Sequence, residues 1–191
     1  MNALSSTKLS LEDFTITQFN TNEHNFDASL LENLELENAF WRFSIKLWED
    51  GRLRSLMLRL QDEQGLRVNL LLFAVWLSTE DKMLAGHFED VKIYTKEWHE
   101  AVVAPLRRVR KCLPDSERTA SLKSQIQQCE LYSEQLEQAL LFTFSGKIPK
   151  MSYLDSPLAQ KLTHNLLASQ IPQSELLLLV DTCVIALNAL H

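Results

Sequence analysis

The hydrophobic pattern of the chain is centred on one apolar run. Nine of the ten residues from 68 to 77 are apolar, and no helical face through them is polar. Few of them are β-branched and helical patterns lie on both sides, so we predict a helix that is buried all round. Asn69 is the exception in this run. A buried amide needs hydrogen-bond partners, for which Arg107 and the carbonyl groups of Val102 and Val103 are our candidates.

Apolar residues recur every three or four positions through most of the remaining chain, as in amphipathic helices. Pro105 should kink or break the longest of these units near 102–104. The last helix is apolar nearly all round and should be largely buried. The predicted helical segments are 29–50, 52–64, 68–77, a short turn at 79–86, 88–113, 116–146, 156–169 and 175–190. This pattern predicts an all-α, single-domain helical bundle of six to eight helices around the central apolar helix.

The first 28 residues differ from the rest of the chain. They are rich in Ser, Thr, Asn and acidic groups, and their apolar residues follow no sustained period. Such a composition is typical of a mobile tail. We therefore expect a mobile N-terminal tail at 1–28 and one helical domain at 29–191, for which a chain of 191 residues with 46% apolar content is long enough.

The charge is unevenly distributed along the chain. The formal net charge is -6, which argues against a general nucleic-acid binder. Residues 1–50 carry 3 basic and 9 acidic groups, residues 51–111 carry 11 and 8, and residues 112–191 carry 5 and 8. A basic middle third between acidic flanks suits docking within the molecule as well as it suits an external partner.

The cysteines and the apolar runs indicate a cytoplasmic protein. Cys112, Cys129 and Cys183 are odd in number and show neither a disulfide pattern nor a zinc-binding spacing. No apolar run approaches the ~18 to 20 residues of a membrane span, and the N-terminus lacks the pattern of a signal peptide. We therefore expect a cytoplasmic location and no membrane span.

The motifs of common enzymes are not found in the sequence. The four glycines fall at predicted helix ends and form no phosphate-binding loop, and the five histidines form no metal-binding pattern. Glu130, Glu134 and Glu137 share one helical stripe, which we interpret as a solvated face. His99 is interpreted as a partly buried or surface histidine rather than a general base. We predict no catalytic residue, metal or cofactor, and the balance favours a protein that is not an enzyme.

Two groups of residues are candidates for binding. Four cations fall within five residues at the end of a predicted helix, where cations complement the helix dipole but four exceed what a cap needs. They could bind an anionic partner, either an acidic protein surface or RNA. All four tryptophans, Trp48 included, fall on predicted core stripes, and three of them could instead line an apolar pocket between helices. The two groups are Arg107, Arg108, Arg110 and Lys111, and Trp41, Trp76 and Trp98.

Three blocks of sequence carry a resemblance to a known family. They are Phe40-Trp41-Arg42-Phe43-Ser44, the segment from Gln61 through Val68-Asn69-Leu70-Leu71-Leu72-Phe73, and Trp98 followed by Val102-Val103-x-Pro105-Leu106-Arg107. The chain resembles a family of small proteobacterial proteins known as a domain of unknown function, over roughly residues 38–190. The resemblance implies a cytoplasmic helical protein and carries no activity or catalytic residues.

Two hypotheses for the function follow. The first is a non-enzymatic helical binding or regulatory module that contacts a protein partner or another anionic surface through residues 107–111. The alternative is an enzyme or carrier with an apolar interhelical pocket for a lipid-like or aromatic small molecule. Asn69 is a candidate binding residue in both, and the oligomeric state stays open.

Overall fold

The computed structural model describes residues 29–151 and 155–190, and the expected N-terminal tail at 1–28 lies outside this part. The regular elements within the described ranges are helices, and an isolated antiparallel bridge joins Lys82 and Lys150. The all-α, single-domain prediction is confirmed. No helix in the described part is long and apolar enough to cross a membrane.

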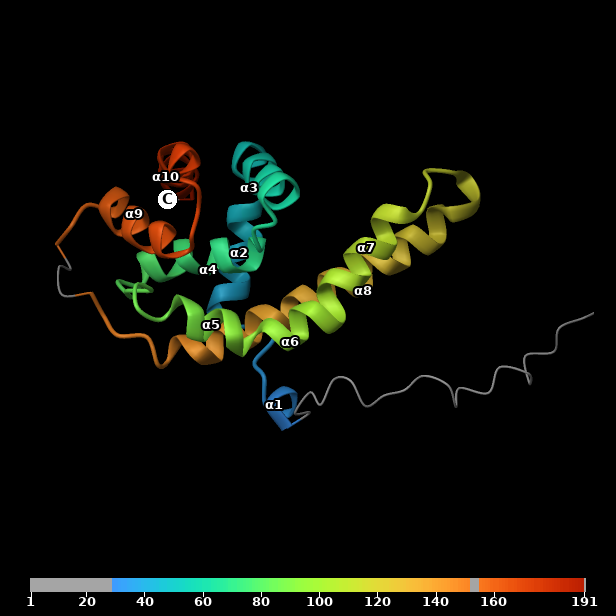
Figure 1. Ribbon diagram of the computed structural model, residues 1–191, viewed down its shortest axis with the longest axis horizontal. Helices are drawn as coiled ribbons and strands as arrows, with labels where there is room; N and C mark the ends of the chain where they lie inside the picture. The colour runs from blue at the N-terminus through green and yellow to red at the C-terminus, as the bar shows by residue number, and fades with distance from the viewer. Residues whose placement is uncertain (1–28, 152–154, 191) are drawn as a thin grey trace, which may run out of the picture.

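Figure 1 shows the order of the helices along the chain. Element η3 is a π-helix and the others are α-helices. In order they are α1 (Ser29–Glu32), α2 (Ala39–Trp48), α3 (Gly51–Gln64), α4 (Val68–Thr79), α5 (Phe88–Tyr94), α6 (Lys96–Trp98), η3 (His99–Val103), α7 (Ala104–Cys112), α8 (Glu117–Ser145), α9 (Leu158–Ala168) and α10 (Gln173–Asn188).

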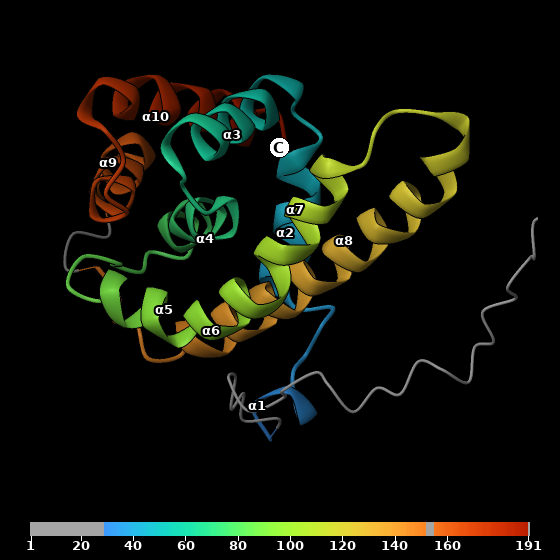
Figure 2. The same ribbon diagram turned by 45° about the vertical axis from the view of Figure 1, so that its right-hand side comes forward.

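Helix α4 is the predicted central helix. Every residue from Val68 to Ser78 is buried, and α4 packs against α2, α3, α8 and α9. Figures 1 and 2 both show it between the α9–α10 pair and α8. Its aromatic residues Phe73 and Trp76 pack with Phe40 of α2, with ring centroids 5.2 to 6.0 Å apart. Burying a large apolar side chain contributes roughly 1.5 to 3 kcal/mol, so α4 anchors the core.

The segment predicted as one helix from residue 29 to 50 is divided into α1 and α2. Asn38, which is fully buried, accepts a hydrogen bond from the backbone N–H of Trp41 and donates one to the carbonyl of Glu35. An asparagine that caps in this way favours a new helix start. The single-helix prediction is wrong here because the side chain of Asn38 satisfies a backbone N–H group in the first turn of a new helix.

Pro105 marks a change in helix type, as expected. The π-helix η3 immediately precedes α7, which carries Pro105 in its first turn. Proline lacks a backbone N–H and crowds the preceding turn, which displaces the usual hydrogen-bond pattern. The segment predicted as one helix from 88 to 113 is divided into α5, α6, η3 and α7, which accounts for most of the elements beyond the expected six to eight. Pro105 explains the change from η3 to α7, whereas the boundary between α5 and α6 lies at Thr95.

Helix α8 consists of an exposed half and a buried half. Figures 1 and 2 show α7 and the first half of α8 extending together as a two-helix arm. From Glu130 onward α8 contains buried residues and packs against α2 and α4. The arm and the core therefore meet near Glu130.

Two local predictions are wrong. Residues 80–87 form a loop rather than a short helical turn, with Asp81 in a left-handed conformation at φ 57°. Helix α10 is not buried all round, because Leu177, Leu178 and Ile185 are 51 to 70% exposed. Its other face packs on α3 and α9.

Candidate functional site

The carboxylate stripe of α8 lies largely inside the molecule, so its interpretation as a solvated face is wrong. Glu130 is 5% exposed and Glu137 is 1% exposed. Arg67 forms an ion pair with Glu137, and His99 Nδ1 lies 3.0 Å from Oε1 of the same carboxylate. Burial opposes ionisation of Glu137, but the hydrogen bond from His99 and the charge of Arg67 outweigh it and lower its pKa. Glu137 is therefore an ionised carboxylate in the interior.

Asn69 is buried as predicted, and its side chain is paired with α8. Its Nδ2 donates to Glu137 Oε2 at 2.5 Å and to the carbonyl of Glu134 at 3.4 Å. Its Oδ1 accepts a hydrogen bond of 2.9 Å from Gln138 Nε2. The expected partners, Arg107 and the carbonyl groups of residues 102 and 103, are wrong, because the polar face of α8 lies against the start of α4.

Arginines of α7 cover the outer part of the same stripe. Arg107 forms ion pairs with Glu130 and Glu134, and Arg110 forms a second ion pair with Glu130. Burial opposes ionisation of Glu130, but hydrogen bonds from both arginines lower its pKa. Burial instead raises the pKa of Glu134 to about 7, although the charge of Arg107 acts in the opposite direction.

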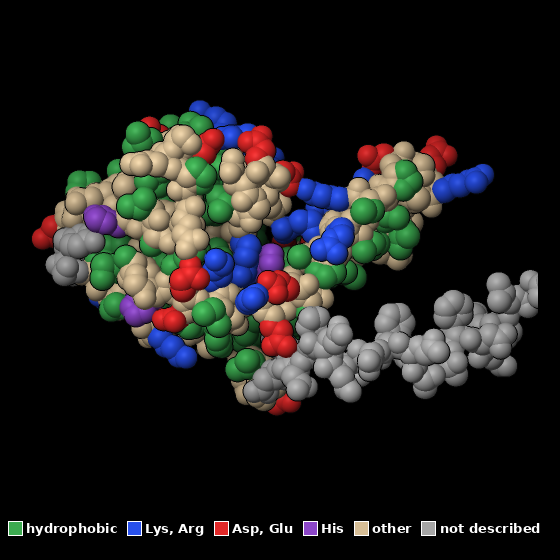
Figure 3. All heavy atoms as spheres, viewed as in Figure 1, with side chains coloured by type: hydrophobic (Ala, Val, Ile, Leu, Met, Phe, Trp, Pro, Cys, Tyr) green, Lys and Arg blue, Asp and Glu red, His purple; other side chains and the backbone are tan. Residues whose placement is uncertain are grey.

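The basic cluster is thus mostly neutralised within the molecule. Lys111 forms an ion pair with Asp62 of α3, in addition to the pairs of Arg107 and Arg110. Arg108 is exposed. In Figure 3, basic and acidic side chains are mixed where the arm leaves the rest of the molecule. Three of the four cations pair with carboxylates of α3 and α8, which explains why the cluster is larger than a helix cap requires.

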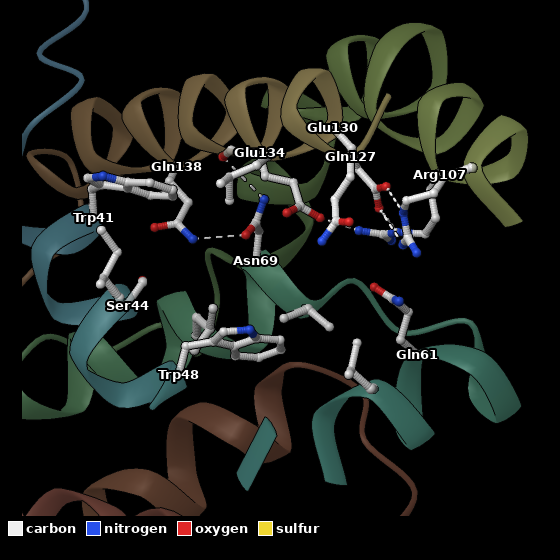
Figure 4. Close-up of a pocket in the computed structure, with 16 residues that line it drawn as sticks. Trp41, Ser44, Trp48, Gln61, Asn69, Arg107, Gln127, Glu130, Glu134 and Gln138 are labelled. Carbon is white, nitrogen blue, oxygen red and sulfur yellow. Dashed lines mark hydrogen bonds and ion pairs between the residues drawn. The ribbon is translucent and has the colours of Figure 1, made fainter. Parts of the chain in front are cut away.

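A pocket of about 360 Å³ opens between the arm and the core. Ile45, Leu58 and Leu131 are 40 to 54% exposed and form its mouth. Its inner end is formed by the buried residues Asn69 and Gln138 together with others from α2 and α4 (Figure 4). The remaining lining residues are Trp41, Ser44, Trp48, Gln61, Val68, Leu72, Arg107, Arg110, Gln127, Glu130 and Glu134.

Three polar atoms of the pocket lining have no hydrogen-bond partner within the described structure: Ser44 Oγ, Gln61 Oε1 and Gln138 Oε1. Ser44 and Gln138 are each 3% exposed. Figure 4 shows the amide nitrogen of Gln138 directed at Asn69 and its oxygen turned toward α2. A buried polar atom without a partner costs roughly 1 to 3 kcal/mol, so these three atoms mark where a ligand would make hydrogen bonds.

The tryptophans do not meet as the sequence suggested. Trp41 and Trp48 line the pocket, whereas Trp76 and Trp98 are not among its lining residues. Trp76 packs in the aromatic core against Phe40 and Phe142. Trp98 donates its indole N–H to the carbonyl of Ser133 on α8. Of the three expected tryptophans, Trp41 alone belongs to this pocket, and Trp48 takes the place of the other two.

Several residues of the site were not among the predicted binding residues, namely Ser44, Trp48, Gln61, Arg67 and Gln138, and Glu130, Glu134 and Glu137 were predicted to lie on a solvated face. The sequence does contain a pattern that indicates the pairing of the arm with the carboxylate stripe. Arg107 and Arg110 lie three apart on one predicted helix, and Glu130 and Glu134 lie four apart on the next. Opposite charges in register on two consecutive helices indicate a paired hairpin. No local pattern pointed to Ser44 or Gln61.

A metal centre finds no support in the described ranges, where no cluster of three or more His, Cys, Asp or Glu side chains could hold an ion. The carboxylates of the stripe are occupied by guanidinium groups instead. The arrangement is that of a binding pocket with a polar, internally neutralised wall.

Comparison with known proteins gives one match. A family model described as "Protein of unknown function (DUF2390)" matches residues 39–141. This range contains every residue of the pocket lining, and α9 and α10 lie outside it. Neither the curated proteins nor the solved structures contain a match to the chain.

Proposed function

From the premise that the chain belongs to the DUF2390 family of proteins of unknown function, we propose that it is a small-molecule-binding protein. The ligand site is the pocket between α2, α3, α4, α7 and α8. The ligand carries a flat apolar or aromatic group that contacts Trp41 and Trp48.

The observation that carries this proposal is the combination of size and lining. Small-molecule sites are typically concave spaces of ~300 to 1,000 Å³ with apolar walls and a few placed polar groups. The pocket has about 360 Å³, two tryptophans and several aliphatic side chains. Three polar atoms in the same lining are without partners in the described structure.

Binding of an anionic macromolecule through Arg107–Lys111 is the less supported alternative. Cations that bind phosphates or acidic surfaces must be free to pair with them. Here Arg107 and Arg110 are 15% and 27% exposed at their side chains and are bound to Glu130. An external anion would have to displace these buried pairs, which favours the pocket as the functional feature.

The proposal is tested with two neutral probes, 2-naphthamide and methyl 2-naphthoate, titrated into the full chain by calorimetry. We expect saturable binding with one site for at least one of them. In Ile45→Trp the larger side chain narrows the mouth, and the affinity should fall about tenfold or more, corresponding to ~1.4 kcal/mol.

Ile185→Trp is the matched control, because Ile185 of α10 is as exposed as Ile45, at 51% against 46%, and does not line the pocket. This variant should bind like the wild type. The proposal is overturned if neither probe saturates, or if the two variants bind equally well.

The cellular setting belongs to the same proposal. We infer a cytoplasmic protein from a proteobacterium, on the basis of the family resemblance and of the free cysteines, of which Cys112 and Cys129 are exposed and Cys183 is buried.

A further inference from the structure

The charge of Glu137 determines which groups at the inner pocket wall donate hydrogen bonds and which accept them. An ionised carboxylate only accepts hydrogen bonds. Because Arg67 and His99 hold Glu137 in its charged form, the groups that face it must donate. Asn69 therefore turns its Nδ2 group toward Glu137, at 2.5 Å from Oε2.

The orientation of the Asn69 amide determines the orientation of the Gln138 amide. With its nitrogen directed at Glu137, Asn69 presents Oδ1 to Gln138, which must donate its Nε2 group at 2.9 Å. The remaining atom of the amide, Gln138 Oε1, is buried on the pocket side and has no partner in the described structure. The chain Glu137–Asn69–Gln138 thus ends in an acceptor on a residue of the pocket lining, and Figure 4 shows its last link, from Gln138 to Asn69.

The other unpaired atoms of the pocket agree with this polarity. Gln61 Oε1 is a second acceptor without a partner in the described part, and Ser44 Oγ can accept as well as donate. Asn69 Nδ2 donates to Glu137 and to the carbonyl of Glu134, and Gln138 Nε2 donates one of its two N–H groups to Asn69 Oδ1. Gln138 Oε1 and Ser44 Oγ are thus the atoms without partners near the inner end, whereas Gln61 Oε1 lies on the α3 side of the pocket (Figure 4).

We infer that the ligand presents an N–H donor to Gln138 Oε1 and carries no anionic group at that end. Its chemical class is a planar ring with an amide, amino or ring N–H group. This inference rests on the proposed function of the pocket and adds the chemistry of the polar end. A carboxylate or phosphate there would face the acceptor Gln138 Oε1, while Arg107 and Arg110 of the same lining are already paired with Glu130 and Glu134.

Three probes with the same ring test the inference. 2-Naphthamide carries an N–H donor, methyl 2-naphthoate replaces it with a methoxy group, and 2-naphthoate is an anion. Calorimetry on the full chain at pH 7.5 should show the amide binding roughly tenfold more tightly than the ester, the ratio expected for one well-made hydrogen bond. The anion should bind most weakly.

Two substitutions test whether Gln138 causes the preference for the amide over the ester. In Gln138→Met the acceptor is lost while the volume is kept, so the amide and the ester should bind with equal affinity. Gln128→Met is the matched control, because Gln128 lies on the exposed part of α8 and outside the pocket lining. It should keep the tenfold preference.

Ser44→Ala serves as a second variant that does not disturb the amide chain. It removes a hydroxyl group without a partner in the described structure and should fold like the wild type, with the preference for the amide kept or reduced by less than in Gln138→Met.

The outcomes separate the two proposals. Equal binding of amide and ester to the wild type, tightest binding of the anion, or an unchanged preference in folded Gln138→Met overturns the inference and leaves the pocket as a binding site. Absence of binding by all three probes overturns both.

Discussion

At the scale of single residues, the side chain of Asn69 joins the central helix α4 to the polar face of α8. Asn69 stands alone among apolar neighbours, so its burial could be predicted from the sequence, and it is 6% exposed. Its partners Glu137 and Gln138 lie about 70 residues further along the chain, where no local pattern singled them out. The stripe of Glu130, Glu134 and Glu137 was predicted to be solvated because the guanidinium groups that cover it come from other parts of the chain.

Replacing Asn69 should reveal the strength of this pairing. Asn69→Leu leaves Glu137 Oε2 and Gln138 Nε2 without their partner, and each unpaired group costs roughly 1 to 3 kcal/mol. We expect the free energy of unfolding to fall by at least ~2 kcal/mol in urea titrations. Asn188→Leu, at an exposed position of α10, should change it by less than ~0.5 kcal/mol. Equal stability of Asn69→Leu and the wild type would contradict the pairing.

Glu134 should make stability depend on pH. Its pKa rises from 4.5 to about 7 on folding, so the folded state holds the proton more tightly than the unfolded state. The wild type should therefore lose stability relative to Glu134→Gln as the pH rises from about 4.5 to 7. At ~1.4 kcal/mol per pKa unit, the difference approaches ~3 kcal/mol by pH 8. Unfolding titrations at pH 5 and pH 8 measure it, and a variant that gains nothing at pH 8 would refute the raised pKa.

Arg107 and Arg108 are adjacent in sequence but differ in their contacts, so replacing each of them tests the internal ion pairs. Arg107 binds Glu130 and Glu134, and its loss leaves the buried charge of Glu130 with Arg110 alone. Breaking a buried pair costs ~3 to 5 kcal/mol, and Arg107→Ala should fall near the lower end because its side chain is 15% exposed. Arg108→Ala, at an exposed position, should change stability by less than ~0.5 kcal/mol. Thermal and urea unfolding of both variants compare them, and similar losses would argue against the internal pairing.

At the scale of elements, helix ends with a local chemical signal were predictable. Asp50 caps α3 with hydrogen bonds to the N–H groups of Arg52 and Leu53, and Gly65 ends it at φ 67°. The start of α2 has such a signal too, because Asn38 caps it by accepting a hydrogen bond from the N–H of Trp41. The π-helix η3 lies just before Pro105, but its contacts with a distant segment, such as the hydrogen bond from Trp98 to the carbonyl of Ser133, cannot be read from a local pattern.

Two glycines of α3 test the local signal. Gly65→Ala forces a Cβ into the left-handed region and should lower the free energy of unfolding by ~1 to 2 kcal/mol, since no neighbour lies within 4 Å to add a clash. Gly51→Ala, in the first turn of the same helix, should leave stability unchanged or raise it by up to ~1 kcal/mol. Chemical denaturation measures both, and a loss at Gly51 equal to that at Gly65 would contradict the role of φ.

At the scale of the whole molecule, the uneven charge along the sequence agrees with the ion pairs that join the middle and last thirds of the chain. The basic middle third supplies Arg59, Arg67, Arg107 and Arg110, and the acidic last third supplies their partners Glu175, Glu137, Glu130 and Glu134. Docking within the molecule, one of the two interpretations of that pattern, describes these pairs. The pairs of Arg107 and Arg110 form part of the pocket lining, and the position of the pocket could not be predicted because five helices contribute to it.

The most direct test of the central claim uses the four indole N–H signals of the tryptophans in ¹H–¹⁵N NMR spectra. Trp41 and Trp48 line the pocket, whereas Trp76 lies in the aromatic core and Trp98 is bonded to Ser133. On titration with 2-naphthamide, the signals of Trp41 and Trp48 should shift in a saturable way while those of Trp76 and Trp98 stay nearly constant. Saturable shifts confined to Trp76 or Trp98, or no shift at all, would contradict a ligand site in this pocket.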